Sequence, residues 1–228
     1  MGKDISVYKK YIRIFWIIYV TGVVAIFLMF FMIAQGWLGF MPSFEDLENP
    51  ESLLASEVVS SDGVVLGKYF KENRSYVNYE ELSPVLLNAL VATEDVRFYN
   101  HSGIDIRGLV RVVKGIVTAD SNSGGGSTIS QQLAKMLFPR DNLHNKFQLI
   151  FRKFKEWVIA VKLEKSYTKE EILTMYLNKY DFLNLAVGIK SAATIYFNTT
   201  PKNLTLEQCA MLVGMAKNSS LYNPVRRP

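Results

Sequence analysis

Apolar residues along this chain form one long uninterrupted run, and shorter stripes at helical spacing follow it. Residues 14–34 contain no charged residue and are dense in Ile, Val, Phe and Met. About 20 apolar residues are enough to cross a bilayer as a helix, so this run predicts a membrane span. Lys3, Lys9, Lys10 and Arg13 precede it and indicate a cytoplasmic N-terminus. A cleaved signal peptide is the alternative, although its apolar core is shorter, about 7–15 residues.

The pattern beyond the apolar run predicts a linker and one larger helical region. Apolar residues on either side of Asp62 and Gly63 predict a small β-hairpin that turns at this pair, and little else in the chain suggests strands. The expected organisation is a cytoplasmic tail at 1–13, a transmembrane anchor at 14–37, a linker at 38–54 and a domain at 55–228.

From Ser83 onward the apolar positions recur at the spacing of a helix. Ser83 is a candidate N-cap, with Pro84 at the first helical position. Capping boxes begin at Thr168 and Thr205. Further helices are expected at about 105–118, 145–165 and 186–197. The pattern therefore predicts a mainly α fold.

Composition narrows the classes of function. The chain has 228 residues and is 49% hydrophobic, which is enough for one domain with a proper core. The formal net charge of +5 is too small to indicate nucleic acid, and the basic excess suits a membrane surface instead. The single cysteine, Cys209, excludes an intrachain disulfide.

A glycine-rich stretch at 124–135 is the first candidate for a binding site. Ser127 or Thr128 can cap the helix that follows, whose free amides suit an anionic group such as phosphate. Ser127, Gln131 and Lys135 recur every four residues and so share one side of that helix. The stretch is not a P-loop, because no Gly-Lys-Ser/Thr follows the glycines. The alternative is a flexible loop before an ordinary helix.

Two glutamates are candidate catalytic groups. Glu94 lies within an apolar stripe with Leu87 and Phe98, and a carboxylate among apolar neighbours has the raised pKa that a general base needs. A solvated or salt-bridged glutamate at a helix end is the alternative. Glu156 follows Arg152 by four residues, so the two can form a surface ion pair. The alternative is that Glu156, with the basic residues Arg152, Lys153 and Lys155, faces the same cleft as Glu94.

These segments together resemble the motifs of the peptidoglycan glycosyltransferase family. That family comprises the monofunctional glycosyltransferases and the glycosyltransferase domain of class A penicillin-binding proteins. The segments that carry the resemblance are 92–105 for the first motif, 125–135 for the second, 152–156 for the third, 171–178 for the fourth and 221–224 for the tail. The family's glycine-rich stretch after the fourth motif is reduced here to Gly188.

The resemblance implies a lysozyme-like helical domain, here truncated at its C-terminal end, that polymerises lipid II into glycan strands at the inner (cytoplasmic) membrane. Glu94 would deprotonate the acceptor hydroxyl, and Glu156 would assist at the donor diphosphate, directly or through a divalent metal, Mg²⁺ or Mn²⁺. Substrate would be held by Ser127, Gln131, Lys135, Arg152 and Lys153. The motifs would be kept in shape by Asp95, Phe98, His101, Gly103 and Asn178. The implied partners are lipid II, the lipid-linked strand and cell-wall synthesis proteins.

Two other functions are compatible with the sequence. A lysozyme-like enzyme that cleaves glycan would share the fold and the acid, but it needs no cationic diphosphate site. A non-enzymatic membrane scaffold would not require Glu94, Gln131 and Glu156 together.

Overall fold

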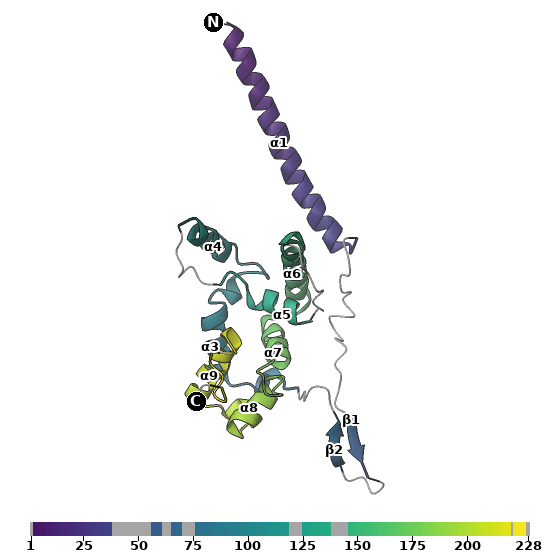
Figure 1. The fold of residues 1–228 in the computed structure, drawn as a ribbon, viewed down its shortest axis with the longest axis vertical. Coiled ribbons are helices and arrows are strands. Elements are labelled where there is room, and N and C mark those ends of the chain that lie inside the picture. Colours follow the sequence, from purple (N-terminus) through teal and green to yellow (C-terminus); the bar gives the residue numbers. More distant parts are fainter. Residues whose placement is uncertain are drawn as a thin grey trace.

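The computed structural model describes residues 2–37, 56–60, 65–69, 76–118, 125–137, 146–219 and 221–226. These residues form a mainly α-helical molecule, as the sequence predicted (Figure 1). In chain order the elements are α1 (Gly2–Ala34), β1 (Ser56–Val59), β2 (Val65–Tyr69), η1 (Tyr79–Glu81), α3 (Pro84–Glu94), η2 (Phe98–Asn100), α4 (Ile106–Thr118), α5 (Ile129–Leu137), α6 (Lys146–Ser166), α7 (Lys169–Lys179), α8 (Ile189–Phe197), η3 (Pro201–Asn203) and α9 (Leu206–Lys217).

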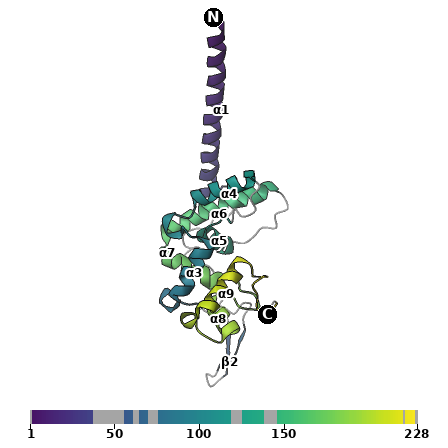
Figure 2. The same ribbon diagram turned by 90° about the vertical axis from the view of Figure 1, so that its left-hand side faces the viewer.

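Helix α1 projects from the rest of the molecule as a single rod (Figures 1 and 2). Its segment Tyr8–Ala34 is long and apolar enough to cross a membrane, and only 6% of the most apolar window is buried within the structure. The helix ends at Ala34, three residues before the expected end of the anchor at 37. The predicted linker at 38–54 lies outside the described residues.

The base of α1 packs against α6. The ring of Phe30 meets that of Phe154 edge-on, with centroids 5.3 Å apart, and Ile33 is only 1% exposed. Lys162 Nζ lies 3.5 Å from the backbone oxygen of Ala34, at the C-terminal end of α1. A cation there complements the helix dipole, so these contacts join the apolar helix directly to the helical domain.

Strands β1 and β2 pair in an antiparallel register that sets Ser56 opposite Tyr69. The turn predicted at Asp62 and Gly63 lies outside the described residues. The pair is placed at the far end of the molecule from the free end of α1 (Figure 1).

The core is formed where α5 packs against α6 and α7, and where α3 packs against α9. Leu90, Leu133, Leu163 and Ile172 are fully buried in it. The α5 helix is therefore enclosed by its neighbours, and the side chains on its remaining face have fixed positions.

Local sequence signals account for several helix boundaries. The hydroxyls of Thr168 and Thr205 accept hydrogen bonds from the third amide of their helices, which confirms both capping boxes.

Asn178 is buried at 7% exposure, and its side chain bonds both the amide and the carbonyl of Val77 at 3.1 and 2.9 Å. Asn178 thus joins α7 to the segment that leads into α3.

Two predicted helices are shorter than expected. Helix α3 stops at Glu94 because the backbone leaves the helical region at Asp95 (φ −156°), so Phe98 lies in η2 and not on the same helix. Helix α8 begins at Ile189 and not at 186, because the backbone amide of Gly188 bonds to the carbonyl of Tyr180. The intervening loop places Leu183, Asn184 and Leu185 at positive φ, where glycine is usual.

Candidate active site

A buried hydrogen bond between Asp95 and His101 stabilises the loop after α3. His101 Nδ1 accepts a hydrogen bond from the amide of Gly103 at 3.2 Å, so its Nε2 carries the proton and donates to the Asp95 carboxylate at 3.0 Å. The Asp95 Oδ2 atom also accepts from the amide of Ile129, the first residue of α5. Asp95 therefore connects the first motif to the second.

Gly103 is the second connection between these motifs. Its φ is +90°, and a Cβ atom on it would lie 2.8 Å from the backbone of Ala160 in α6, so no other residue fits without a shift. Its carbonyl accepts from Thr128 Oγ1 at 2.7 Å and from Gln131 Nε2 at 3.2 Å. The backbone at Gly103 thus holds the start of α5 against α6.

The sequence left open which hydroxyl caps α5, and the structure assigns this role to Thr128. The amide of Gln131 donates to Thr128 Oγ1 at 3.2 Å. Ser127 instead accepts from Lys153 Nζ at 3.0 Å. The Thr128 hydroxyl therefore caps α5, whereas the Ser127 hydroxyl binds the Lys153 side chain.

Glu94 is the last residue of α3 and is half-buried. Its Oε2 accepts a hydrogen bond from Gln132 Nε2 at 2.7 Å. Its Oε1 is buried and has no hydrogen-bond partner among the described residues. Leu87 and Phe98, the apolar neighbours named from the sequence, are buried, but the carboxylate itself faces a polar partner and not only apolar neighbours.

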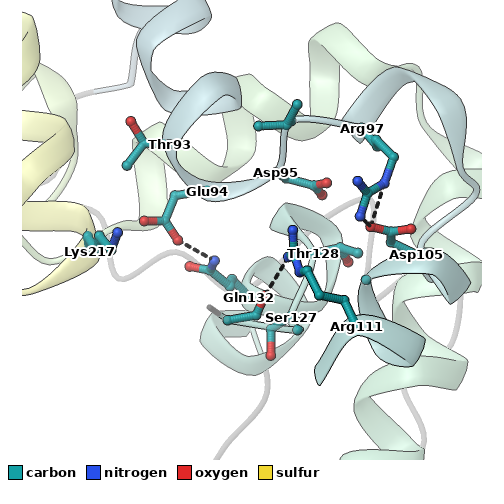
Figure 3. Close-up of a pocket in the computed structure, with 14 residues that line it drawn as sticks. Thr93, Glu94, Asp95, Arg97, Asp105, Arg111, Ser127, Thr128, Gln132 and Lys217 are labelled. Carbon is teal, nitrogen blue, oxygen red and sulfur yellow. Dashed lines mark hydrogen bonds and ion pairs between the residues drawn. The ribbon is translucent and has the colours of Figure 1, made fainter. Parts of the chain in front are cut away.

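Glu94 lines an open cavity of about 420 Å³, which we call the Glu94 cavity (Figure 3). The charged and polar side chains in its wall come from α3, α4, α5 and α9 and from the loops between them. They are Thr93, Glu94, Asp95, Arg97, Asp105, Arg111, Ser127, Thr128, Gln132 and Lys217.

A second cavity of about 210 Å³ adjoins the first and shares Ser127 and Gln132 with it. We call it the cationic cavity. It brings together all five residues that the resemblance assigned to substrate binding, and Glu156 with them. Its lining is Ser127, Gln131, Gln132, Lys135, Leu149, Arg152, Lys153 and Glu156.

Glu156 lies between two cations of its own helix. Lys153 Nζ is 2.9 Å from its Oε2, and Arg152 Nε is 3.8 Å from its Oε1. Glu156 is 8% exposed, whereas the Arg152 and Lys153 side chains keep about a third of their surface open at 35% and 37%. Lys135 is exposed at the same cavity. With three cations against one carboxylate, the formal charge favours an anionic ligand.

The described residues do not fit a divalent metal held by protein ligands alone. No group of three or more His, Cys, Asp or Glu side chains comes together among them. Glu156 is the only carboxylate in the lining of the cationic cavity, and both of its oxygens face cations. A metal here would need oxygens from its ligand or from water, so we assign it no step.

An ion pair shapes the opposite wall of the Glu94 cavity. Arg97 contacts Asp105 Oδ2 through Nη2 at 2.5 Å and through Nε at 3.0 Å. The hydrogen bond from Arg97, helped by the amide of Gly108, holds the pKa of Asp105 below its ordinary value. Asp105 accepts from the amide of Gly108 and so caps α4, and its bonds to Arg97 fix the Arg97 side chain.

Behind the site, a buried set of polar groups joins α5, α6 and α7. Glu164 accepts from Ser130 Oγ at 2.5 Å and pairs with Lys169 Nζ at 2.6 Å. The Lys169 ammonium also donates to the His101 carbonyl at 2.7 Å and lies over the Phe98 ring, 4.2 Å from its centroid. One ammonium group therefore contacts both the buried Phe98 ring and the backbone of the first motif.

Several residues that line the Glu94 cavity were not singled out from the sequence, and Gln132, Arg111 and Lys217 are among them. Gln132 was overlooked because the four-residue spacing singled out Gln131 beside it. Arg111 shares one face of its helix with Arg107 and Lys114, a pattern typical of a solvated face or of a helix that lies on lipid. Lys217 lies at the end of α9, far from the other site residues in the sequence. The helical spacing of the basic residues in α4 contained the signal for Arg111.

The transglycosylase family model matches residues 62–228. The chain belongs to this family. Penicillin-binding protein 1A of Neisseria lactamica is 39% identical over 189 residues, which cover 82% of this chain and 23% of that protein. Penicillin-binding protein 1F of Bacillus subtilis is 39% identical over 174 residues, or 76% of this chain and 24% of that protein.

The transglycosylase match confirms the resemblance to the peptidoglycan glycosyltransferases and, with it, the lysozyme-like helical fold. The chain spans about a quarter of the length of the two relatives, 23% and 24%.

Proposed function

We propose that this domain is a peptidoglycan glycosyltransferase that polymerises lipid II. The observation that supports it most is the contact between the two cavities. A candidate base, Glu94, lines one of them, and a cluster of cations lines the other, with Ser127 and Gln132 in the shared wall. Transfer of a sugar from a diphosphate to a hydroxyl requires a base and an anion site side by side.

In the proposed reaction, the donor is the growing strand linked to undecaprenyl diphosphate, which binds with its diphosphate in the cationic cavity. The acceptor is a lipid II molecule whose sugar 4-hydroxyl lies in the Glu94 cavity. Glu94 takes the proton of this hydroxyl while its oxygen forms a bond to C1 of the donor sugar. The bond from C1 to the diphosphate oxygen breaks, and the electron pair leaves with undecaprenyl diphosphate.

The cations would act on the leaving group. Arg152 and Lys153 already lie against Glu156, and Lys135 adds a third positive charge at the rim. Negative charge grows on the diphosphate as the bond breaks, so fixed cations stabilise the transition state more than the ground state. Glu156 would keep Arg152 and Lys153 in position. The divalent metal implied by the resemblance could add to this charge, but the mechanism of the described residues does not depend on it.

We further propose that α1 holds the domain at the outer face of the inner membrane, with the N-terminus in the cytoplasm. The exposed apolar span Tyr8–Ala34 and the basic residues Lys9, Lys10 and Arg13 support this topology. Cysteine labelling in spheroplasts tests it. A cysteine at position 60 that reacts only after the membrane is broken would reverse the assignment.

One assay separates the proposed function from its alternatives. The full-length protein is incubated with lipid II, and in parallel with preformed glycan. Glycan polymer from lipid II supports the proposal, whereas shortening of preformed glycan supports a lysozyme-like hydrolase. If neither occurs with folded, membrane-inserted protein, the enzymatic proposal fails and a scaffold remains.

A further inference from the structure

Three side chains from three helices form a chain of hydrogen bonds that ends at Glu94. The Tyr176 hydroxyl on α7 donates to Gln132 Oε1 on α5 at 3.1 Å. The Gln132 Nε2 atom in turn donates to Glu94 Oε2 at the end of α3 at 2.7 Å. Tyr176 is 0% exposed, so the chain starts in the core and ends in the Glu94 cavity.

The direction of the Gln132 amide follows from the chemistry at its two ends. An ionised carboxylate only accepts hydrogen bonds, so the amide nitrogen must face Glu94 and the amide oxygen must face Tyr176. Burial raises the pKa of the Tyr176 hydroxyl far above its ordinary value, and the charge of Glu94 adds to this effect. The hydroxyl therefore stays protonated and donates a hydrogen bond to the amide oxygen.

The two oxygens of Glu94 are consequently not equivalent. Oε2 is held by Gln132, whereas Oε1 is buried and has no hydrogen-bond partner in the described part of the chain. A buried acceptor without a donor is costly, so the bond from Gln132 to Oε2 is the side-chain contact that holds this carboxylate in place.

The position of Gln132 is fixed by its helix. The amide of Ile129 is bonded to Asp95, and Ser130 Oγ is bonded to Glu164, so the first turn of α5 is held from two sides. The long glutamine side chain still has several rotatable bonds of its own. The Tyr176 hydroxyl removes this freedom by holding the far end of the amide.

From these contacts we infer that Gln132 and Tyr176 are positioning residues, which orient the Glu94 carboxylate so that it can receive the proton of the acceptor hydroxyl. This inference rests on the proposed role of Glu94 as the base. Gln132 also lines both cavities and is therefore near bound substrate. Tyr176 is absent from the lining of either cavity, so among the described residues its influence passes through Gln132.

The test is steady-state kinetics of lipid II polymerisation as a function of pH, with the full-length protein and its Tyr176→Phe variant. The variant keeps the ring in the core and loses only the hydroxyl. We expect kcat to fall about 3- to 10-fold, the range for one neutral hydrogen bond, while KM changes less than about twofold. The acid limb of the rate profile should move to higher pH, because donation from Gln132 favours the ionised carboxylate.

A second variant, Gln132→Met, removes the direct partner at similar side-chain length. Loss of a hydrogen bond to a charged group predicts a fall in kcat of about 10- to 100-fold. Because the two residues act in series, the double variant should be no slower than Gln132→Met alone, within about twofold. A double variant whose defect is the product of the two single defects would overturn the series arrangement.

Tyr180→Phe is the matched control. Tyr180 is the C-cap residue of α7, one turn after Tyr176, and its hydroxyl donates to the carbonyls of Met215 and Ala216 at 3.1 and 2.7 Å. Its loss should lower the melting temperature without moving the acid limb. The charged groups around Glu94 also affect this limb, but they are the same in all the variants. They are Asp95, Arg97, Asp105, Arg111 and Lys217. The Tyr180 hydroxyl has a raised pKa and stays neutral, so Tyr180→Phe removes no charge near Glu94.

The outcomes separate this inference from the proposed function. If Glu94→Gln abolishes polymerisation but folded Tyr176→Phe and Gln132→Met proteins keep the parental kcat and acid limb, the positioning role is wrong and the base assignment stands. If folded Glu94→Gln protein polymerises at the parental rate, the base assignment fails. Should Tyr176→Phe fail to fold, the pH profile of Gln132→Met decides alone, and an unmoved acid limb refutes the inference.

Discussion

The Asp95 carboxylate accepts a hydrogen bond from the backbone amide of Ile129 at 3.1 Å. Asp95 directly follows Glu94, and Ile129 begins α5, so this bond joins the end of one helix to the start of another. A negative charge at a helix N-terminus is favourable, which strengthens the contact. Gln132 lies one turn further along α5, and its spacing from Glu94 is therefore set by Asp95.

Replacing the candidate base should remove activity and leave the fold intact. Glu94→Gln keeps the shape and the hydrogen-bonding capacity of the side chain but cannot accept a proton. We expect lipid II polymerisation to fall by about 10²–10⁴-fold with little change in substrate binding. Glu80→Gln, an exposed glutamate in η1, is the control and should polymerise normally. Activity within about threefold of the parent, in a variant with an unchanged melting curve, would rule out Glu94 as the base.

The cationic cavity should lose affinity when one of its charges is removed. Lys135→Ala should weaken binding of a lipid-linked diphosphate by about 1.5–3 kcal/mol, the range for a charge-assisted hydrogen bond. Lys165→Ala removes another exposed lysine, near the end of α6, that does not line the cavity. Titration calorimetry in detergent compares the two. Equal affinities for both variants would exclude Lys135 from the diphosphate site.

Gly103 should tolerate no side chain. Gly103→Ala forces a Cβ against the backbone of Ala160 at a φ of +90° and should destabilise the protein by about 2–4 kcal/mol. Gly125→Ala is the control, because its Cβ would meet nothing within 4 Å. That variant should stay within about 0.5 kcal/mol of the parent. Urea unfolding measures both, and similar losses would mean that the close packing at Gly103 is not what restricts it.

The ion pair of Arg97 with Asp105 should make stability depend on pH in a defined direction. The folded-state pKa of Asp105 is lowered, so the stabilisation is complete above its ordinary value of 3.8 and is lost as the pH falls through the lower folded value. Arg97→Gln should therefore lower the melting temperature near neutral pH, and its difference from the parent should shrink toward pH 3. Arg107→Gln removes a nearby exposed charge and should show no such convergence.

The loop before α8 should gain stability from a glycine. Leu185 has a φ of 63° and is 74% exposed, so Leu185→Gly removes backbone strain and loses few contacts. A gain of about 0.5–1 kcal/mol is expected, because the relieved strain exceeds the added entropy of the unfolded chain. Leu206→Gly is the control: Leu206 is 64% exposed but helical, and its replacement should destabilise. Thermal melts of both variants compare the signs.

The parts of the fold that depend on neighbouring residues could be predicted from the sequence. The Thr168 and Thr205 caps are examples, because each needs only a hydroxyl and a partner three residues later. The end of α3 could not be predicted, because an apolar stripe that included Phe98 continued past the point where Asp95 turns away to bond with α5. Three successive residues at positive φ could not be expected of a Leu-Asn-Leu sequence either.

The candidate site shows the same division. The four-residue spacing of Ser127, Gln131 and Lys135 correctly placed all three along one cavity. The bond between Gln132 and Glu94 joins residues 38 positions apart, and it exists only because α3 and α5 end and begin where they do. Spacing along one helix contains no information about such a contact, so it required the structure.

The joint between α1 and α6 has a consequence for how substrate arrives. Phe154, which packs on Phe30, is the neighbour of Lys153, so the cationic cavity opens on the same helix that carries the membrane-side joint. Under the proposed topology, a substrate with its tail in the bilayer reaches the cavity by sideways diffusion, without leaving the lipid. Its effective concentration is then the number of molecules per membrane area. Adding inert lipid to vesicles at constant bulk substrate would slow such an enzyme by surface dilution alone.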